Sequence, residues 1–464
     1  MDILSRLKAI TPYVLTGEDA LPYGRDWVGK YETAPLAVVR PGTTEEVSAI
    51  LAFCHETDTP VVPMGGNTGL TGATAAEGAL VLSLDRMQTI REIRPEARLA
   101  VVEAGVILQN LHEATAEHGL TYPMTFGAKG SARIGGTLAT NAGGSNVLRY
   151  GNTRDLCLGI EVVLADGRVL DLMSELHKDN SGYDLRDLII GSEGTLGVIT
   201  AAVVKLAPLP LAYASAMVTV PDLSAALDLL NALQTRTGGM VEAFEYMPRD
   251  YMANLKRFRA DLTPPLGHDQ DHTIFLEVAS TMARDCTPDE TGQLPLTAHL
   301  EETLGEMFEE GLVLDAALAQ SEAQRRLMWE IREAAAEISV AIKPVVINDL
   351  CLPLDQIESF LSRAKTTLSA LDPGFGTCVV AHLGDGNIHY TVYPSAPDLA
   401  DPLMEAVEDI VKDMRGSFSA EHGIGLSKLP SMRRRKDPVA LEMMRAVKAA
   451  FDPKGILNPG KTLP

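Results

Sequence analysis

Two histidines, His382 and His389, lie on either side of an Asp-Gly dipeptide in the β-rich stretch 378–393. Asp-Gly favours a two-residue hairpin loop, so we expect a strand, a turn at Asp385-Gly386 and a returning strand. In that register the two histidines are directly opposite each other, and paired side chains project from one face with Cβ atoms about 5 Å apart. Two imidazoles so placed can bind one metal ion. A hydrogen-bonded core pair and a chance exposed pair are the alternatives.

A carboxylate is the expected third ligand, because catalytic zinc sites often combine two histidines with one glutamate and keep a fourth position open. Glu421, in the run 418–425, is the best candidate. On a regular strand Glu421 and His422 would point in opposite directions. Gly423 and Gly425 predict a loop, in which both side chains can turn to one side. The pattern therefore predicts a divalent metal, zinc by donor type.

Two glycine-rich runs, residues 63–69 and 127–144, offer a different kind of chemistry. Closely spaced glycines let successive backbone N–H groups point at one anion, which suits a phosphate or pyrophosphate. The side chains of Thr68, Ser131 and Asn141 can add donors. Tight turns in a sheet-rich domain are the alternative for either run alone. Neither run fits the GxGxxG or GxxxxGK[ST] pattern, so a NAD or P-loop site is weakly supported.

The first 208 residues predict an α+β domain of mixed short strands and helices that carries both glycine runs. Thr43 followed by two glutamates predicts a helix start, and the helix should continue to His55. An Asp-Gly turn at 166–167 predicts a hairpin. We expect strands at 37–41, 61–63, 80–84, 100–104, 160–164 and 169–172.

The prolines in the segment 206–211 mark a domain boundary. Residues 209–430 predict a second α+β domain, the substrate or cap domain, which carries the metal site. It combines helical patterns at 223–236 and 321–342 with a strand at 273–278. Residues 431–464 form a short C-terminal segment.

The charge balance excludes one class of partner. The chain of 464 residues has 40 Lys+Arg against 62 Asp+Glu, a formal net charge of −22. Such a protein is repelled by phosphate backbones unless it carries a dense basic patch. The one basic run, Arg433–Lys436, is short and predicts a solvated helix face. Nucleic acid and anionic membrane surfaces are therefore poor candidate partners.

The cysteines and the amino terminus predict a soluble cytoplasmic protein. Five scattered cysteines without a CxxC motif fit a reducing compartment. The first six residues lack the apolar core of a signal peptide. No apolar run approaches the roughly 20 residues that cross a bilayer.

Two further runs, 178–185 and 190–200, narrow the interpretation. With the glycine runs they resemble the vanillyl-alcohol oxidase/p-cresol methylhydroxylase superfamily, in its D-2-hydroxyglutarate and D-lactate dehydrogenase branch. The resemblance extends from about residue 30 to the C-terminus and implies FAD. Some relatives attach FAD covalently to a His or Cys in the two glycine runs. Neither glycine run contains a His or a Cys here, so we expect non-covalent FAD. The implied FAD contacts are Pro63, Gly65, Gly66, Asn67, Thr68, Gly69, Thr71, Gly127, Ser131, Gly135, Thr140, Asn141, Gly144, Gly194, Ile199 and Asn458. By the same resemblance the C-terminal segment 431–464 would return to the flavin, where Asn458 would reach it.

The resemblance also implies a reaction. A D-2-hydroxy acid, D-2-hydroxyglutarate first, would lose a hydride from C2 to flavin N5, with His422 as the base. Metal bound by His382, His389 and Glu421 would orient the hydroxyl. Arg332 would bind the substrate carboxylate through its planar guanidinium, although a surface arginine on a charged helix is the alternative. Asn387 would contact substrate.

The chain departs from the 2-hydroxyglutarate pattern at two polar substrate positions. Ala336 replaces a Thr and Ile347 replaces a Lys. Both residues help hold the distal carboxylate in that group, so D-lactate, D-malate and glycolate are alternative substrates. We hypothesise that Lys343, nearby in the sequence, substitutes for the missing Lys.

Two other functions compete with this interpretation. An alkyl-dihydroxyacetone-phosphate-synthase-like transferase would share the flavin domain, but it has a His-rich run where this chain has Glu421-His422. A metal-dependent hydrolase would explain the histidines but neither glycine run. For the dehydrogenase, the family implies electron-transfer flavoprotein or a quinone as electron acceptor, and a homodimer is compatible with the sequence.

Overall fold

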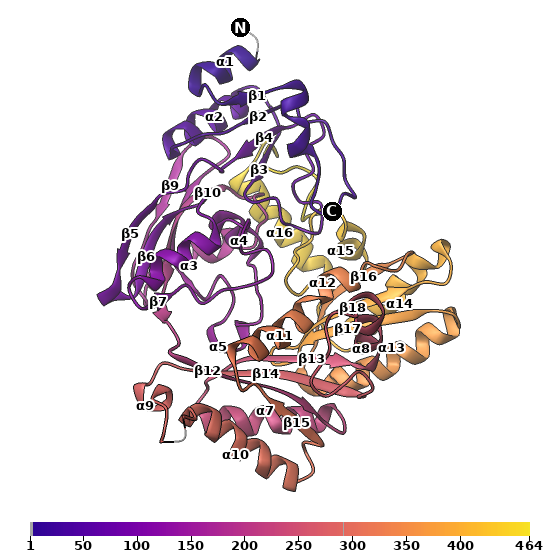
Figure 1. The fold of residues 1–464 in the computed structure, drawn as a ribbon. Helices are drawn as coiled ribbons and strands as arrows, with labels where there is room; N and C mark the ends of the chain where they lie inside the picture. The colour runs from indigo at the N-terminus through magenta and orange to yellow at the C-terminus, as the bar shows by residue number, and fades with distance from the viewer. Residues whose placement is uncertain (1–2, 291) are drawn as a thin grey trace. The chain divides into compact units, whose positions relative to one another are not determined.

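The computed structural model describes residues 3–290 and 292–464; Met1, Asp2 and Thr291 lie outside the described residues. The chain divides into two compact units (Figure 1). The boundary between the units after residue 208 falls within the proline-bearing segment 206–211. The chain re-enters unit 1 at Glu421, earlier than the predicted boundary at 430, and Gly144–Arg149 belongs to unit 2. Unit 1 is Met1–Gly143, Tyr150–Pro208 and Glu421–Pro464, and unit 2 is Gly144–Arg149 and Leu209–Ala420.

The first sheet of unit 1 has four strands in the order β1-β2-β4-β3, of which β2, β4 and β3 are parallel. Helix α2, Thr44–Glu56, follows β2 in the chain. The Thr43 side chain accepts a hydrogen bond from the Glu46 N–H and so caps this helix, as the sequence predicts. Buried side chains of α2, including Leu51, share one core with Leu82. The strands are β1 Val14–Leu15, β2 Ala37–Val39, β3 Val61–Met64 and β4 Leu80–Ser83.

The second sheet of unit 1 is antiparallel, with the order β5-β6-β10-β8-β9. The predicted hairpin joins β8 to β9 through Gly167, whose φ of +87° favours glycine. Helix α4, Ile134–Thr140, carries part of the second glycine run and contributes Ile134 and Leu138 to the core. The strands are β5 Ile90–Arg94, β6 Leu99–Glu103, β8 Cys157–Val163, β9 Val169–Leu172 and β10 Val198–Lys205.

The C-terminal segment returns to the first sheet. After helix α16, Pro438–Phe451, the chain pairs with β3: the Val61 N–H donates to the Ile456 carbonyl at 2.8 Å. The Asn458 N–H donates back to the Val61 carbonyl at 2.7 Å. The tail therefore lies beside the strand that leads into the first glycine run.

Unit 2 is built on a seven-stranded sheet with the order β15-β12-β14-β13-β17-β18-β16 (Figure 1). Every neighbouring pair is antiparallel. The predicted strand 273–278 is the middle of β14. The strands are β12 Ala212–Thr219, β13 Val241–Pro248, β14 His272–Ser280, β15 Asp315–Leu318, β16 Val346–Cys351, β17 Gly376–His382 and β18 Asn387–Tyr393.

Helices cover both faces of this sheet, so its strands are buried on both sides. Alternate residues of one strand face opposite sides: in β13, Phe244 belongs to one core and Met247 to the other. The predicted helix 321–342 is divided into α11 and the short α12. The first core includes α7 Leu223–Thr237, α10 Pro295–Glu309, α13 Ile357–Leu371 and α14 Ala400–Asp413, and the second includes α8 Arg249–Phe258, α11 Glu322–Glu333 and α12 Ala335–Ile338.

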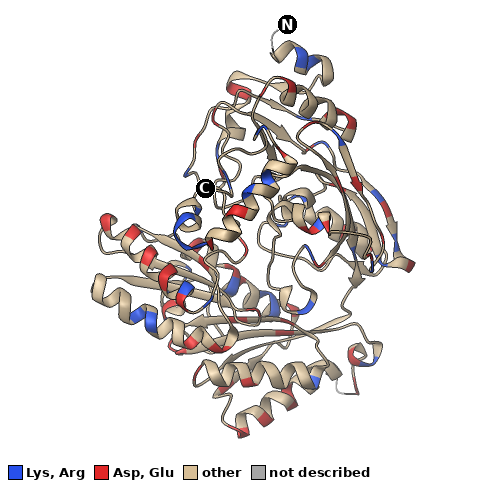
Figure 2. Ribbon diagram, turned by 180° about the vertical axis from the view of Figure 1, so that it is seen from behind, with Lys and Arg blue, Asp and Glu red and all other residues tan. Residues whose placement is uncertain are grey.

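Acidic and basic residues are interspersed over the helices of each unit (Figure 2). The basic run 433–436 begins inside helix α15, Leu429–Arg435. Arg433 and Arg434 are exposed but Arg435 is buried, so the prediction of a fully solvated face was wrong at that residue. Among the described helices, none combines the length and apolar character that a membrane span requires.

Candidate functional site

The histidine hairpin has a longer loop than the sequence predicts. His382 pairs with Asn387, and His389 pairs with Val380, so four residues form the loop instead of two. The His382 carbonyl accepts from the N–H groups of residues 385 and 386, and the N–H of buried Leu383 bonds to β13. The predicted direct opposition of the two histidines was therefore wrong, by a shift of two residues.

The shift of two residues preserves the face from which the histidines project, because side chains alternate with a period of two. His382 and His389 become diagonal neighbours, with ring centroids 5.5 Å apart in an edge-on arrangement. Both remain on the side of the sheet that includes Met247 and Val380. The corrected register therefore still places both imidazole rings on one face of the sheet.

A buried carboxylate, Glu245 of β13, connects His382 to Arg332. Its Oε1 lies 2.8 Å from His382 Nδ1, and its Oε2 accepts from Arg332 Nε at 2.6 Å. Burial alone would raise the pKa of Glu245, but His382 and Arg332 outweigh burial and lower its pKa to about 2. Sequence reasoning missed Glu245. The available signal was a pair of acidic residues, Glu242 and Glu245, among the apolar residues of one strand.

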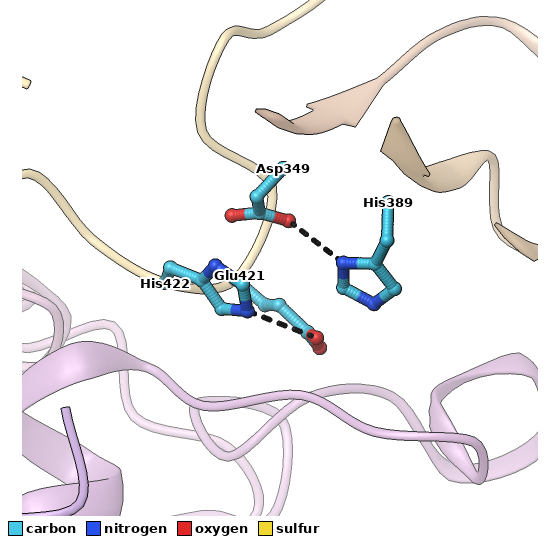
Figure 3. Close-up of side chains that lie close together, drawn as sticks. All are labelled: Asp349, His389, Glu421 and His422. Carbon is cyan, nitrogen blue, oxygen red and sulfur yellow. Dashed lines mark ion pairs between the residues drawn. The ribbon is translucent and has the colours of Figure 1, made fainter. Parts of the chain in front are cut away.

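Four side chains that could bind a metal ion lie close together: Asp349, His389, Glu421 and His422 (Figure 3). Each offers one donor atom, and these atoms all lie within 4.8 Å of one another. Asp349 Oδ1 is 3.9 Å from His389 Nδ1, and Glu421 Oε1 is 3.8 Å from His422 Nε2. The sequence predicted His389 and Glu421 as ligands and His422 as base, but it missed Asp349, the cross-strand partner of His389. His382 lies outside this group of four.

The backbone at Glu421 and His422 is irregular, as the two following glycines predict. Gly423 has φ +76° and Gly425 has φ +51°, both in the left-handed region. Just before them, the Ala420 N–H donates to Asp349 Oδ2 at 3.1 Å, which ties the start of this segment to strand β16. The loop therefore lets both neighbouring side chains turn toward one group, which a strand would forbid.

Asn387 begins β18 beside this group. Its Nδ2 donates to Asp349 Oδ1 at 3.0 Å and to the Leu350 carbonyl at 2.9 Å. Its buried Oδ1 has no hydrogen-bond partner within the described part of the chain. A buried amide oxygen without a partner is costly, so this atom is suited to accept from a bound ligand.

The first glycine run of unit 1 packs directly on the second. A Cβ on Gly66 would lie 2.2 Å from the Ser131 carbonyl oxygen, and one on Gly65 would lie 3.3 Å from the Gly136 Cα. Only glycine allows so close an approach of two backbones. Gly69, in contrast, has nothing within 4 Å of a Cβ position. The two runs thus pack together as one cradle, with open space at Gly69.

The C-terminal Asn458 completes this cradle. Its Nδ2 donates to the Ala73 carbonyl at 3.1 Å and to the Glu193 carbonyl at 2.7 Å. Its Oδ1 is buried and, among the described residues, has no hydrogen-bond partner. A cradle of backbone N–H groups with an unsatisfied amide acceptor fits a pyrophosphate-linked cofactor whose ring system carries hydrogen-bond donors. The predicted FAD residues of unit 1 therefore fit FAD.

Buried Glu193 holds the segment after His422 against the 190–200 run within unit 1. Its carboxylate accepts from the Ile424 N–H at 2.7 Å and from the Gly425 N–H at 2.8 Å. Burial raises its pKa, and the two backbone donors act in the opposite direction. Sequence reasoning assigned no role to Glu193. Its position between two glycine-flanked loops was the available signal.

Several predicted FAD residues have structural partners in unit 1. Pro63 packs on Gly194, and Gly135 approaches Ala104, where a Cβ would lie 2.6 Å from the alanine Cβ. Ile199 is a core residue. These positions shape the cradle by close packing, whether or not their backbone also contacts the cofactor.

The remaining predicted FAD residues lie in or near the two glycine runs. Asn67 has φ +53°, and its side chain bonds to Arg25 and Thr74. Asn141 has φ +49° and ends α4. Gly144 belongs to unit 2 instead of the predicted FAD domain. The others are Thr68, Thr71, Gly127, Ser131 and Thr140, all of which lie in unit 1.

The two positions that depart from the 2-hydroxyglutarate pattern are exposed. Ile347, in the edge strand β16, is 44% exposed. It lies two residues before Asp349 and thus on the same face of the sheet. Ala336 and Lys343 are also exposed.

Two family models match this chain, one on each side of residue 208. A family model described as an FAD binding domain matches residues 35–173, and one described as FAD linked oxidases, C-terminal domain, matches residues 209–462. The mitochondrial D-2-hydroxyglutarate dehydrogenase of Bos taurus is 38% identical and covers 100% of this chain and 84% of its own length. The D-2-hydroxyglutarate dehydrogenase of Stutzerimonas stutzeri is 35% identical, over 97% of this chain and 95% of its own length.

Among solved structures, p-cresol methylhydroxylase with substrate bound has a TM-score of 0.75 at 18% identity, covering 99% of this chain and 96% of that one. Alkyldihydroxyacetonephosphate synthase has a TM-score of 0.71, also at 18% identity, covering 98% and 84%. At these identities the likeness concerns the fold alone, which is the predicted α+β fold of this superfamily. The chain thus belongs to the family of FAD-linked oxidases, together with proteins named D-2-hydroxyglutarate dehydrogenase.

Proposed function

We propose that this FAD-dependent hydroxy-acid dehydrogenase oxidises D-2-hydroxyglutarate to the 2-oxo acid. One observation carries the substrate: relatives of that name are 35–38% identical over essentially the whole chain. The oxidation removes a hydride from C2 and a proton from the hydroxyl group, so the site needs an electron acceptor and a base. Bound FAD supplies the acceptor of the hydride, and a bound divalent cation supplies Lewis-acid polarisation of the hydroxyl.

The chain's own residues divide the remaining work. His422 accepts the hydroxyl proton on an imidazole nitrogen, since histidine titrates near neutral pH. Arg332 binds the C1 carboxylate through its guanidinium, which pairs with carboxylates in two parallel hydrogen bonds. Asn387 accepts from the substrate through its buried Oδ1. Holding C2 in place in this way reduces the entropic cost of the reaction.

The proposed metal ligands are His382, His389 and Glu421, with zinc as the cation that fits nitrogen and carboxylate donors. Asp349 lies beside Nδ1 of His389 and is suited to orient that ring. It is also the alternative third ligand, because its carboxylate belongs to the group of four. His422 remains outside the ligand set, because a base must keep a nitrogen lone pair for the proton.

Non-covalent FAD is part of the proposal, because the glycine runs offer no His or Cys for attachment. The substrate itself is tested by anaerobic mixing of the purified yellow protein with a panel of hydroxy acids. The account expects D-2-hydroxyglutarate to bleach the flavin absorbance faster than D-malate, D-lactate, glycolate or L-2-hydroxyglutarate. Faster bleaching by D-lactate than by D-2-hydroxyglutarate would reassign the substrate, and no bleaching by any of them would reject the dehydrogenase.

A further inference from the structure

Glu245 is a charged residue in the middle of a seven-stranded sheet, where its side chain is 1% exposed. Such burial is costly unless the charge is paired and hydrogen-bonded. Both oxygens are occupied: Oε1 by His382, the direct cross-strand partner of Glu245, and Oε2 by Arg332. One carboxylate therefore contacts two residues to which the proposed function gives separate roles.

The carboxylate of Glu245 determines which nitrogen of His382 carries the proton. An ionised carboxylate only accepts, so the nitrogen facing Glu245, Nδ1, is the donor. In a neutral imidazole the other nitrogen, Nε2, then keeps its lone pair. Nη2 of Arg332 lies 3.3 Å from Nδ1 and 3.2 Å from Nε2, so the arginine does not select between the two nitrogens. The carboxylate thus favours the tautomer in which Nε2 presents its lone pair, as a metal ligand must.

The same carboxylate also restricts the guanidinium of Arg332. Its Oε2 accepts the Nε–H of Arg332, and Nη2 of the same guanidinium lies 3.2 Å from His382 Nε2, so one edge of the guanidinium is held in place. A guanidinium held by one edge is pre-ordered for a carboxylate, because less side-chain entropy is lost when the ligand binds. The charge of Glu245 thus serves both side chains at once.

We propose that Glu245 is a positioning residue that fixes the tautomer of His382 for metal binding and the orientation of Arg332 for the substrate carboxylate. This inference rests on the proposed function. Glu245 contacts neither substrate nor metal in this proposal. Its replacement should therefore change the metal affinity before any other property.

The same sheet contains a matched control. Glu277 of β14 is also buried, at 2% exposed, and accepts from Arg325 of the same helix α11 at 2.7 and 2.8 Å. Its other partners are the Ser215 hydroxyl and the Trp329 indole N–H, with no histidine among them. Glu277 is therefore a buried Glu–Arg pair of the same kind with no proposed part in metal or substrate binding.

The test compares Glu245→Gln with Glu277→Gln in the full-length, FAD-loaded, metal-stripped protein. The amide keeps the shape of the side chain but places an N–H₂ group against His382 or Arg332. Against His382 Nδ1 it forces the proton to Nε2, the wrong tautomer. Calorimetric titration with Zn²⁺ alone should show affinity weakened about 10- to 100-fold in Glu245→Gln, and unchanged in Glu277→Gln. Excess Zn²⁺ should restore part of the flavin-reduction rate in Glu245→Gln, which a folding defect would not allow.

Equal Zn²⁺ affinity of Glu245→Gln and the parent would overturn the inference, and so would a parent protein that binds no Zn²⁺. A thermal scan of each variant separates this result from unfolding, because both substitutions affect a buried ion pair. Failure of the proposed function is distinct: it appears as a parent flavin that no D-2-hydroxy acid reduces, whatever the Zn²⁺ titration shows.

Discussion

Replacement of Gly66 by alanine tests whether the two glycine runs must touch. The new Cβ would lie 2.2 Å from the Ser131 carbonyl oxygen and 3.0 Å from the Ala132 Cα. Both of these atoms are backbone, so no side chain can rotate away. Ordinary contacts between heavy atoms need about 3.5 Å, and the two loops must therefore separate by roughly 1 Å.

Forcing an extra methyl group into a well-packed site costs about 1–3 kcal/mol. In a domain of the size of unit 1, each 1 kcal/mol lowers the melting temperature by about 2–4 °C. Gly66→Ala should therefore lower the melting temperature of the FAD-free protein by about 2–12 °C. It should also weaken FAD binding, because the separated loops no longer present their N–H groups to one anion.

Gly69→Ala is the matched control in the same loop, since its Cβ would have nothing within 4 Å. Differential scanning of the FAD-free proteins should show Gly69→Ala melting within about 1 °C of the parent, or slightly above it, because alanine restricts the unfolded chain. Fluorescence titration with FAD then measures cofactor affinity in each. A Gly66→Ala protein as stable as Gly69→Ala would refute the close approach of the two runs.

Three further predictions concern the tail and the substrate face. Burial lowers the pKa of Lys461 to about 8 from 10.5. Because the unfolded chain keeps this proton to higher pH, the free energy of unfolding should rise between about pH 8 and 10.5. Urea titrations should find a smaller rise in Lys461→Met. Asn458→Asp keeps the shape but removes the donors to two buried carbonyls, so it should cost about 1–3 kcal/mol in urea unfolding; an unchanged midpoint would contradict this. Ile347→Lys should raise kcat/KM for D-2-hydroxyglutarate relative to D-lactate by about tenfold, and a parallel change on both substrates would exclude contact with the distal carboxylate.

Local signals in the sequence predicted much of unit 1. The cap at Thr43, the Asp-Gly hairpin at 166–167 and the strand before Gly65 each depend on residues close together in the chain. The packing of Gly66 on Ser131 joins residues 65 positions apart, and composition predicted only that both loops are unusual. The contact itself depends on tertiary structure.

The site was less predictable for the same reason. The hairpin loop lengthened because Leu383 bonds to Phe244 of a neighbouring strand, which the dipeptide Asp385-Gly386 cannot reveal. Glu245 and Asp349 were missed because each becomes a partner of a histidine only through strand pairing, β13 with β17 and β16 with β18. Acidic residues among the apolar residues of β13 and β16 were the signal that sequence reasoning left unused.

The central claim is that a metal-dependent site reduces bound flavin with a D-2-hydroxy acid. The most direct measurement is anaerobic flavin reduction by D-2-hydroxyglutarate in stopped flow, with the protein first stripped by chelator and then reloaded with Zn²⁺. Dithionite reduces the flavin in both samples and shows that the cofactor is intact. The account predicts slow reduction in the stripped protein and recovery on reloading. Equal rates in the two samples, with metal removal confirmed by elemental analysis, would contradict it.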